Sequence, residues 1–165
     1  GIKGFKNPED YDAMSEIMWC GSLSHNDLTG LGREKDFCVH KFGHALGAKY
    51  DLAHGATLSA MWGSWAEYVY RYDVDRFCHY GQKVWGIQGK DAVETAREAI
   101  RKTVDYFRSL EMPVNLKELE IGTLSDDTLM ELAMNATKGG TVKLSKIKEL
   151  DVNDVYQIFQ SANGR

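Results

Sequence analysis

The chain has 165 residues, of which 43% are hydrophobic and 27% are charged, an ordinary mixture for a globular protein that builds a core. Its net charge of −4 provides no basic surface for nucleic acid, so we expect no nucleic-acid partner. No apolar run approaches the roughly 18 residues that a membrane-spanning helix needs, so we expect no membrane partner and a cytoplasmic location. The length predicts a single domain over residues 1–165.

The first predicted helix carries a strong N-terminal signal. Asn7 can cap a helix, and Pro8 is favoured at the first helical position because its missing N–H would have no partner there. Apolar residues then recur at helical spacing, which predicts a helix that ends near Leu23. The glycines of residues 30–32 predict a loop beyond it.

The next two predicted helices lie on either side of a turn. One is expected from about Asp36 to Lys49, and the other from near Gly55 through Val69. Gly43 and Gly47 interrupt the former at a cost of about 1 kcal/mol each relative to alanine. Glycine at such positions permits the close approach of another helix or of a ligand, and both roles are open at this point.

Helical signals continue to the end of the chain. An amphipathic pattern from Asp91 to Leu110 stops before Pro113. Ser125 caps another predicted helix, which runs through Met134 and is ended by Lys138, Gly139 and Gly140, and Asp151 opens the last one. Because no stretch shows sustained alternation with a period of two, the predicted fold class is all-α, a multi-helix bundle.

The cysteines and one aromatic cluster favour structural roles. An odd, widely spaced set of thiols without a Cys-x-x-Cys motif favours buried free cysteines in a reducing cytosol over a disulfide: Cys20, Cys38 and Cys78. Aromatic residues at close spacing favour core packing over a platform for nucleobases: Trp62, Trp65, Tyr68, Tyr70 and Tyr72.

Three of the five histidines fall within fifteen residues, at His40, His44 and His54. Neutral imidazole is the commonest protein ligand for transition metals, so the cluster indicates a candidate metal site. His40 and His44 are four residues apart and therefore share one face of the predicted helix, so spacing alone favours them as the ligand pair. A chance pair on a surface or in a core is the simpler alternative.

Hydrolytic chemistry does not fit this cluster. A zinc-peptidase helix needs a glutamate directly after its first histidine as the general base, and Lys41 stands there. The longer metzincin pattern requires a third histidine where this chain has Tyr50. A metalloprotease is therefore excluded, and a free-standing hydrolase lacks a carboxylate base beside the histidines.

The run from His40 to Ala60 closely resembles the second metal-binding signature of the iron-containing (group III) alcohol dehydrogenases, and is most similar to their butanol dehydrogenase branch. Further stretches agree with that branch in the same order, so the resemblance covers nearly the whole chain: residues 7–11, 17–19, 83–87, 112–119 and 151–155.

This resemblance implies a ligand pair different from the one that spacing favours. It implies that His40 and His54 bind the metal, Fe²⁺ or in some members Zn²⁺. His44 would lie beside the metal without binding it, near the substrate and the nicotinamide, as the catalytic and cofactor-contacting residue. The family takes two further ligands, an Asp and a His, from a helix before residue 1. It also takes its NAD(P)-binding domain from that missing part.

The chain is therefore expected to form the C-terminal helical domain of an NAD(P)-dependent enzyme that oxidises primary alcohols or reduces aldehydes. The resemblance implies a homodimer at full length, with a small alcohol or aldehyde as substrate. The isolated chain is expected to be inactive. The alternative is a stand-alone, non-enzymatic helical domain with a weak two-histidine metal site, which metal content and nicotinamide binding would distinguish.

Overall fold

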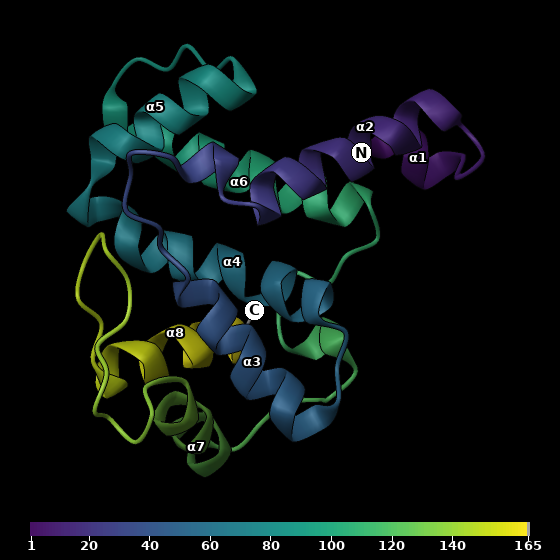
Figure 1. Ribbon diagram of the computed structural model, residues 1–165. Coiled ribbons are helices and arrows are strands. Elements are labelled where there is room, and N and C mark those ends of the chain that lie inside the picture. The colour runs from purple at the N-terminus through teal and green to yellow at the C-terminus, as the bar shows by residue number, and fades with distance from the viewer. Residues whose placement is uncertain (165) are drawn as a thin grey trace. The chain divides into compact units, whose positions relative to one another are not determined.

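The computed structural model describes residues 1–164. Eight α-helices and three short 3₁₀ helices make up the regular structure of this part of the chain, which contains no β-strand. The all-α prediction is confirmed (Figure 1). The chain divides into two compact units, residues 1–35 and the remainder from Asp36 onward, which are described separately below. The expectation of a single domain stays a prediction.

The first unit contains α1 (Ile2–Lys6) and α2 (Tyr11–His25). The prediction that a helix begins at Asn7 and Pro8 is wrong, because α2 begins only at Tyr11. The Asp10 side chain caps α2 by accepting from the Ala13 N–H at 3.0 Å, while the Asn7 side chain accepts from the Glu9 N–H at 3.2 Å. The asparagine thus closes a turn between two helices instead of starting one.

In the second unit, α4 (His54–Val69) is the central helix. It packs against α3 (Cys38–Tyr50), α6 (Ala92–Ser109) and α8 (Val152–Gly164), while α7 (Asp126–Ala136) packs on α3 and α8 (Figure 1). These five helices lie where the sequence predicts them, to within two or three residues at the N-termini. The predicted end of α7 near Met134 and the end of α3 near Lys49 also agree with the structure to within two residues.

The sequence prediction missed α5 (Val74–Trp85), which packs along α6. Its boundary signals are nevertheless present. The Asp73 side chain accepts from the Arg76 N–H at 3.2 Å, and Gly86 ends the helix with φ of +66°. Between them, Gly81 lies so close to Ala99 of α6 that a Cβ atom there would be 3.0 Å from the alanine methyl group.

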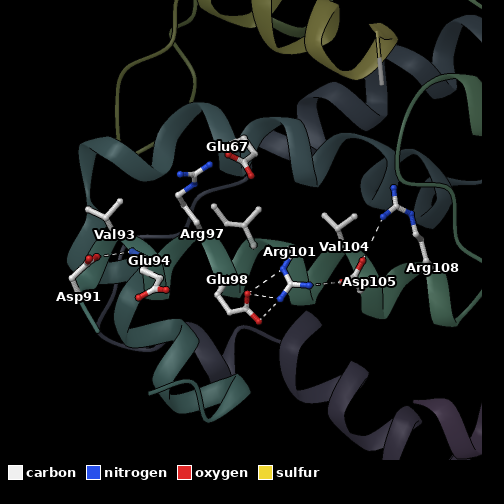
Figure 2. Close-up of a pocket in the computed structure, with 11 residues that line it drawn as sticks. Glu67, Asp91, Val93, Glu94, Arg97, Glu98, Arg101, Val104, Asp105 and Arg108 are labelled. Carbon is white, nitrogen blue, oxygen red and sulfur yellow. Dashed lines mark hydrogen bonds and ion pairs between the residues drawn. The ribbon is translucent and has the colours of Figure 1, made fainter. Parts of the chain in front are cut away.

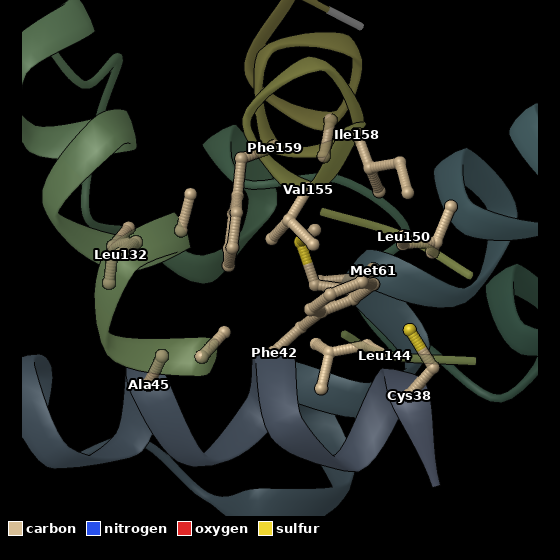
Figure 3. Packing of buried hydrophobic residues seen from close by; sticks show 14 of the residues in the cluster. Cys38, Phe42, Ala45, Met61, Leu132, Leu144, Leu150, Val155, Ile158 and Phe159 are labelled. Carbon is tan, nitrogen blue, oxygen red and sulfur yellow. The ribbon is translucent and has the colours of Figure 1, made fainter. Parts of the chain in front are cut away.

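The core of the second unit lies between α3, α4, α7 and α8 (Figure 3). Phe42 of α3 and Phe159 of α8 are fully buried, with ring centroids 5.4 Å apart. Met61 of α4 and Leu132 of α7 are equally buried, so each of the four helices contributes at least one large side chain. This shared core fixes α3 against α4, and with them the histidine cluster.

Two structural predictions need correction. Tyr72 is not a core residue, because it is 52% exposed, whereas Trp62, Trp65 and the other two tyrosines of the set pack against the core as expected. The cysteines are free, but only Cys38 is buried and Cys20 is exposed. Within residues 1–164, no helix has both the length and the apolar character that crossing a bilayer requires.

Candidate metal centre

The histidine cluster depends on a close contact between α3 and the beginning of α4. Gly43 of α3 faces α4, and a Cβ atom at this position would lie only 2.8 Å from Thr57 Oγ1 and 2.9 Å from Leu58 Cδ2. The same Cβ would be 3.6 Å from Cε1 of His54. The absence of a side chain at Gly43 therefore lets His54 approach the histidines of α3.

A tight turn brings the chain from α3 into α4. Asp51 ends α3 in the left-handed conformation, with φ of +54°, and its N–H donates to the Gly47 carbonyl at 2.9 Å. His54 is then the first residue of α4, one residue earlier than predicted. The His54 ring therefore lies at the end of α4 that faces α3. The Thr57 hydroxyl donates to the His54 carbonyl oxygen at 2.7 Å.

The structure brings all three predicted site residues together. The ring centroids of His40 and His54 lie 5.3 Å apart, and those of His44 and His54 lie 5.2 Å apart with nearly parallel planes, 28° from each other. The two histidines of α3 are farther apart, at 6.5 Å, with nearly perpendicular rings. His54 is therefore close to both of the others, and the pair that spacing alone favours is the most separated.

Solvent exposure distinguishes the three rings. His40 is half-buried and packs edge-on against Phe37 at 5.0 Å, whereas His44 and His54 are exposed. His40 also lines a cavity of about 550 Å³, here named the histidine cavity. Apolar side chains of α4, α6 and the segment after α6 also line this cavity: Leu58, Trp62, Trp65, Phe107 and Met112.

Asp36 is the carboxylate that lines the histidine cavity, and sequence reasoning did not single it out. Its oxygens accept hydrogen bonds from the Cys38 N–H at 2.8 Å, the Ser145 hydroxyl at 2.6 Å and the Lys146 N–H at 2.9 Å. Asp36 thus ties the start of α3 to the loop before α8. No sequence signal could have revealed this, because the partners lie more than a hundred residues away.

Within the described residues, no group of three or more His, Cys, Asp and Glu side chains is arranged to hold a metal ion alone. The donor set nevertheless suits part of a metal shell. Metal–nitrogen bonds of about 2.0–2.1 Å in tetrahedral geometry place two imidazole centroids about 5 Å apart. The His40–His54 separation and the His44–His54 separation both match this requirement.

A second hollow lies along α6 and includes Glu67 of α4, with a volume of about 620 Å³ (Figure 2). Its charged side chains are largely paired with one another on the surface of α6. Arg101 contacts Glu98 at 2.6 Å and Asp105 at 3.7 Å, and Arg108 contacts Asp105 at 3.4 Å. Such exposed pairs contribute little free energy and indicate a solvated helix face instead of a binding site.

Comparison with known proteins covers almost the entire chain. The model of the "Fe-containing alcohol dehydrogenase family, C-terminal" matches residues 2–163. The chain is 36% identical over 164 residues to NADH-dependent butanol dehydrogenase A of Clostridium acetobutylicum, covering 98% of this chain and 41% of that protein. It is 27% identical over 168 residues to NADPH-dependent aldehyde reductase YqhD of Escherichia coli, with coverage of 98% and 41%.

Solved structures agree with these relatives. The NADH-dependent butanol dehydrogenase A of Thermotoga maritima is similar with a TM-score of 0.87 and 26% identity, over 97% of this chain and 41% of that one. The substrate- and cofactor-free form of YqhD from E. coli gives a TM-score of 0.88 at 25% identity, over 98% and 42%. The chain thus spans about two fifths of the length of these proteins. Together with the matched family model and the helical fold, this shows that the chain belongs to the iron-containing alcohol dehydrogenase family and corresponds to its C-terminal domain.

Proposed function

We propose that this chain is the metal-binding, helical part of an NAD(P)H-dependent oxidoreductase that interconverts primary alcohols and aldehydes. The family supports the reaction class, and the relatives named above are butanol dehydrogenases and an aldehyde reductase. The nicotinamide would be bound mainly by the part of such a protein that the present 165 residues do not contain. The homodimer and the cytoplasmic location stay predictions.

Within this proposal, His40 and His54 hold a divalent ion, Fe²⁺ or Zn²⁺. The 5.3 Å between their ring centroids supports His54 over the more distant His44, at 6.5 Å, as the partner of His40. Because His44 lies as close to His54, at 5.2 Å, the choice of His40 over His44 rests on the family resemblance. Two histidines leave at least half of a tetrahedral shell to water or to ligands from elsewhere. We therefore expect the isolated chain to bind metal weakly, with zinc preferred over ferrous iron by the Irving–Williams order.

When bound, such an ion would act as a Lewis acid toward the oxygen of the alcohol or aldehyde. His44 is exposed and its ring lies against that of His54, so it borders the same space without being one of the proposed ligands. A ring nitrogen of His44 would accept the hydroxyl proton of the alcohol during oxidation and return it during aldehyde reduction. The apolar walls of the histidine cavity would exclude water from the adjoining carbon chain.

Calorimetric titration of the chain with zinc tests the ligand assignment. We expect His40→Ala and His54→Ala each to abolish measurable binding, because each removes one of the two proposed ligands. His44→Ala should retain most of the affinity. His25→Ala is a matched control, because His25 is an exposed histidine of α2 and belongs to the other unit.

The same titration can refute the assignment. Loss of zinc binding in His44→Ala, with binding preserved in His54→Ala, would show that the two histidines of α3 form the pair. Equal affinities in all four variants would show that the cluster does not bind metal. Circular dichroism of each variant confirms that the helical content is unchanged.

A further inference from the structure

A further cavity, of about 590 Å³ and distinct from the hollow along α6, adjoins the histidine cavity. We name it the aromatic cavity after the rings that line it: Trp62, Trp65, Phe77, Tyr80, Trp85 and Phe107. Trp62, Trp65 and Phe107 line both cavities, so these three side chains form a shared wall. Both volumes lie within the roughly 300–1,000 Å³ typical of small-molecule sites.

One stripe of α4 leads from the histidines to this wall. His54, Leu58, Trp62 and Trp65 follow at intervals of four, four and three residues, and such residues share one face of a helix. Leu58 and Trp62 line the histidine cavity, and Trp62 and Trp65 continue into the aromatic cavity. A rise of 1.5 Å per residue makes the stripe about 16 Å long, enough for an extended ligand of several carbon atoms.

Several polar groups around the aromatic cavity already have hydrogen-bond partners, whereas Trp65 Nε1 is buried and has none. The Thr103 hydroxyl donates to the Ala99 carbonyl at 2.8 Å and accepts from Trp85 Nε1 at 3.1 Å. Because its proton is used in this way, the 2.7 Å contact with Tyr80 makes the tyrosine hydroxyl the donor. Arg76, at the rim, pairs with Asp73 at 2.7 Å. A polar ligand would therefore find few partners here beyond the Trp65 indole N–H in return for the hydration it loses, whereas an apolar tail has no hydrogen bonds to lose on entry.

The rings also offer the right contacts for an aryl group. Trp62 meets Phe107 edge-to-face with centroids 6.0 Å apart, and Tyr80 at 6.4 Å. These tilted arrangements leave ring faces and edges available to a further aromatic ring. Aromatic rings prefer such edge-to-face or offset-stacked contacts. An apolar ring placed here would extend the existing aromatic cluster.

We propose that the aromatic cavity binds the apolar tail of an aryl-substituted or long-chain primary alcohol or aldehyde whose oxygen lies in the histidine cavity. This inference rests on the proposed function for the identity of the oxygen-bearing end, and the rings of the shared wall guide the tail. It predicts that substrates with an aryl or long alkyl tail bind better than short-chain alcohols.

Nuclear magnetic resonance of the ¹⁵N-labelled chain tests this directly, with 3-phenyl-1-propanol and 1-propanol as probes. The chain has four tryptophans, and three of them line the aromatic cavity. Trp19 lies on α2 in the other unit and is an internal control. We expect 3-phenyl-1-propanol to shift the indole signals of the three cavity tryptophans, with an affinity roughly tenfold or more above that of 1-propanol because the ring is buried.

Two matched variants on α5 test whether the apolar tail binds in the aromatic cavity. Val84 lines the aromatic cavity but not the histidine cavity, and its side chain is 60% exposed, so Val84→Phe should fill the mouth without disturbing the fold. It should reduce the affinity for 3-phenyl-1-propanol about tenfold, to near that of 1-propanol. Gln82→Phe adds the same ring on an exposed position outside either cavity and should change neither affinity.

The outcomes separate this inference from the proposed function. If 3-phenyl-1-propanol shifts only Trp19, or shifts no indole signal, or binds Val84→Phe as well as the unchanged chain, the tail site is refuted, whatever zinc does. If the ring-dependent shifts appear while zinc fails to bind, the tail site stands and the metal assignment fails.

Discussion

Gly43 is the residue on which the contact between α3 and α4 depends. A methyl group at this position would lie within 3 Å of two side chains of α4, those of Thr57 and Leu58. We expect Gly43→Ala to lower the free energy of unfolding by about 1–3 kcal/mol through overpacking, although alanine is the better helix former. Urea denaturation measures this change.

Gly47, one turn later on α3, provides the control. A Cβ atom there would meet only the Leu52 carbonyl oxygen, at an ordinary 3.7 Å. Gly47→Ala should therefore raise the stability by up to about 1 kcal/mol. Destabilisation by both substitutions to the same extent would mean that helix contact at Gly43 is not the cause. Sequence reasoning identified both glycines but could not decide which one faces a neighbouring helix.

The cysteines give a second prediction at this scale. Burial, and to a smaller degree the nearby Asp36, raises the pKa of the Cys38 thiol well above its usual value, so little reactive thiolate forms. Iodoacetamide at pH 8 should label exposed Cys20 rapidly and Cys38 only after urea is added, as peptide mass spectrometry would show. Labelling of Cys38 at the rate of Cys20 in the native chain would contradict the buried position.

Among the secondary-structure elements, five helices of the second unit were predictable from sequence, including α3 and α4, which have no side-chain cap. Ser125 caps α7 as expected, since its side chain accepts from the Thr128 N–H, and Asp91, where the amphipathic pattern begins, caps α6 by accepting from the Glu94 N–H. At Asn7 the same kind of signal was misleading, because a competing side chain, Asp10, forms the actual cap. The α5 helix was not predicted, although Asp73 caps its start and Gly86 ends it.

The attachment of α8 to α4 gives a prediction about pH. Burial alone would raise the pKa of Asp154, but hydrogen bonds from Lys148 and from Tyr68 outweigh it and hold the pKa below its ordinary value. The Tyr68 hydroxyl lies 2.6 Å from one carboxylate oxygen and Lys148 Nζ 2.6 Å from the other. The folded state therefore releases this proton more readily than the unfolded state does.

The stability from Asp154 should be fully present above the unfolded-state pKa of about 3.9 and be lost as the pH falls through the lower folded-state value. Asp154→Asn removes the charge at every pH. The difference in unfolding free energy between the two proteins should be largest near neutral pH and shrink toward pH 2. An unchanged difference across that range would show that the carboxylate charge does not stabilise this contact.

For the whole molecule, the resemblance of one short signature to a family predicted more than any physical pattern did. It favoured His54 over His44 as the partner of His40, and this assignment stays a prediction, since His54 lies about equally close to His40 and to His44. Helical spacing alone favoured His40 and His44, because spacing along the sequence relates only residues of the same helix. The two cavities could not be predicted, since their walls come from residues up to 85 positions apart, from Trp62 to Ile147.

The chain's length leads to a prediction about activity. It covers 41% of the butanol dehydrogenase that it matches at 36% identity. We expect no NADH oxidation above a blank when butanal and zinc or ferrous iron are added to the isolated chain, because the proposed nicotinamide-binding part is not included. A spectrophotometric assay at 340 nm detects this, and sustained turnover would refute the division of roles between the two parts.

The ligand pair is the central claim, and X-ray absorption at the zinc edge of the metal-loaded chain tests it most directly. We expect two imidazole nitrogens at about 2.0–2.1 Å from the zinc, with the remaining positions filled by water oxygen. His44→Ala should leave this spectrum unchanged, and His54→Ala should remove the imidazole signature. Three imidazoles around the zinc, or a spectrum that changes only in His44→Ala, would contradict it.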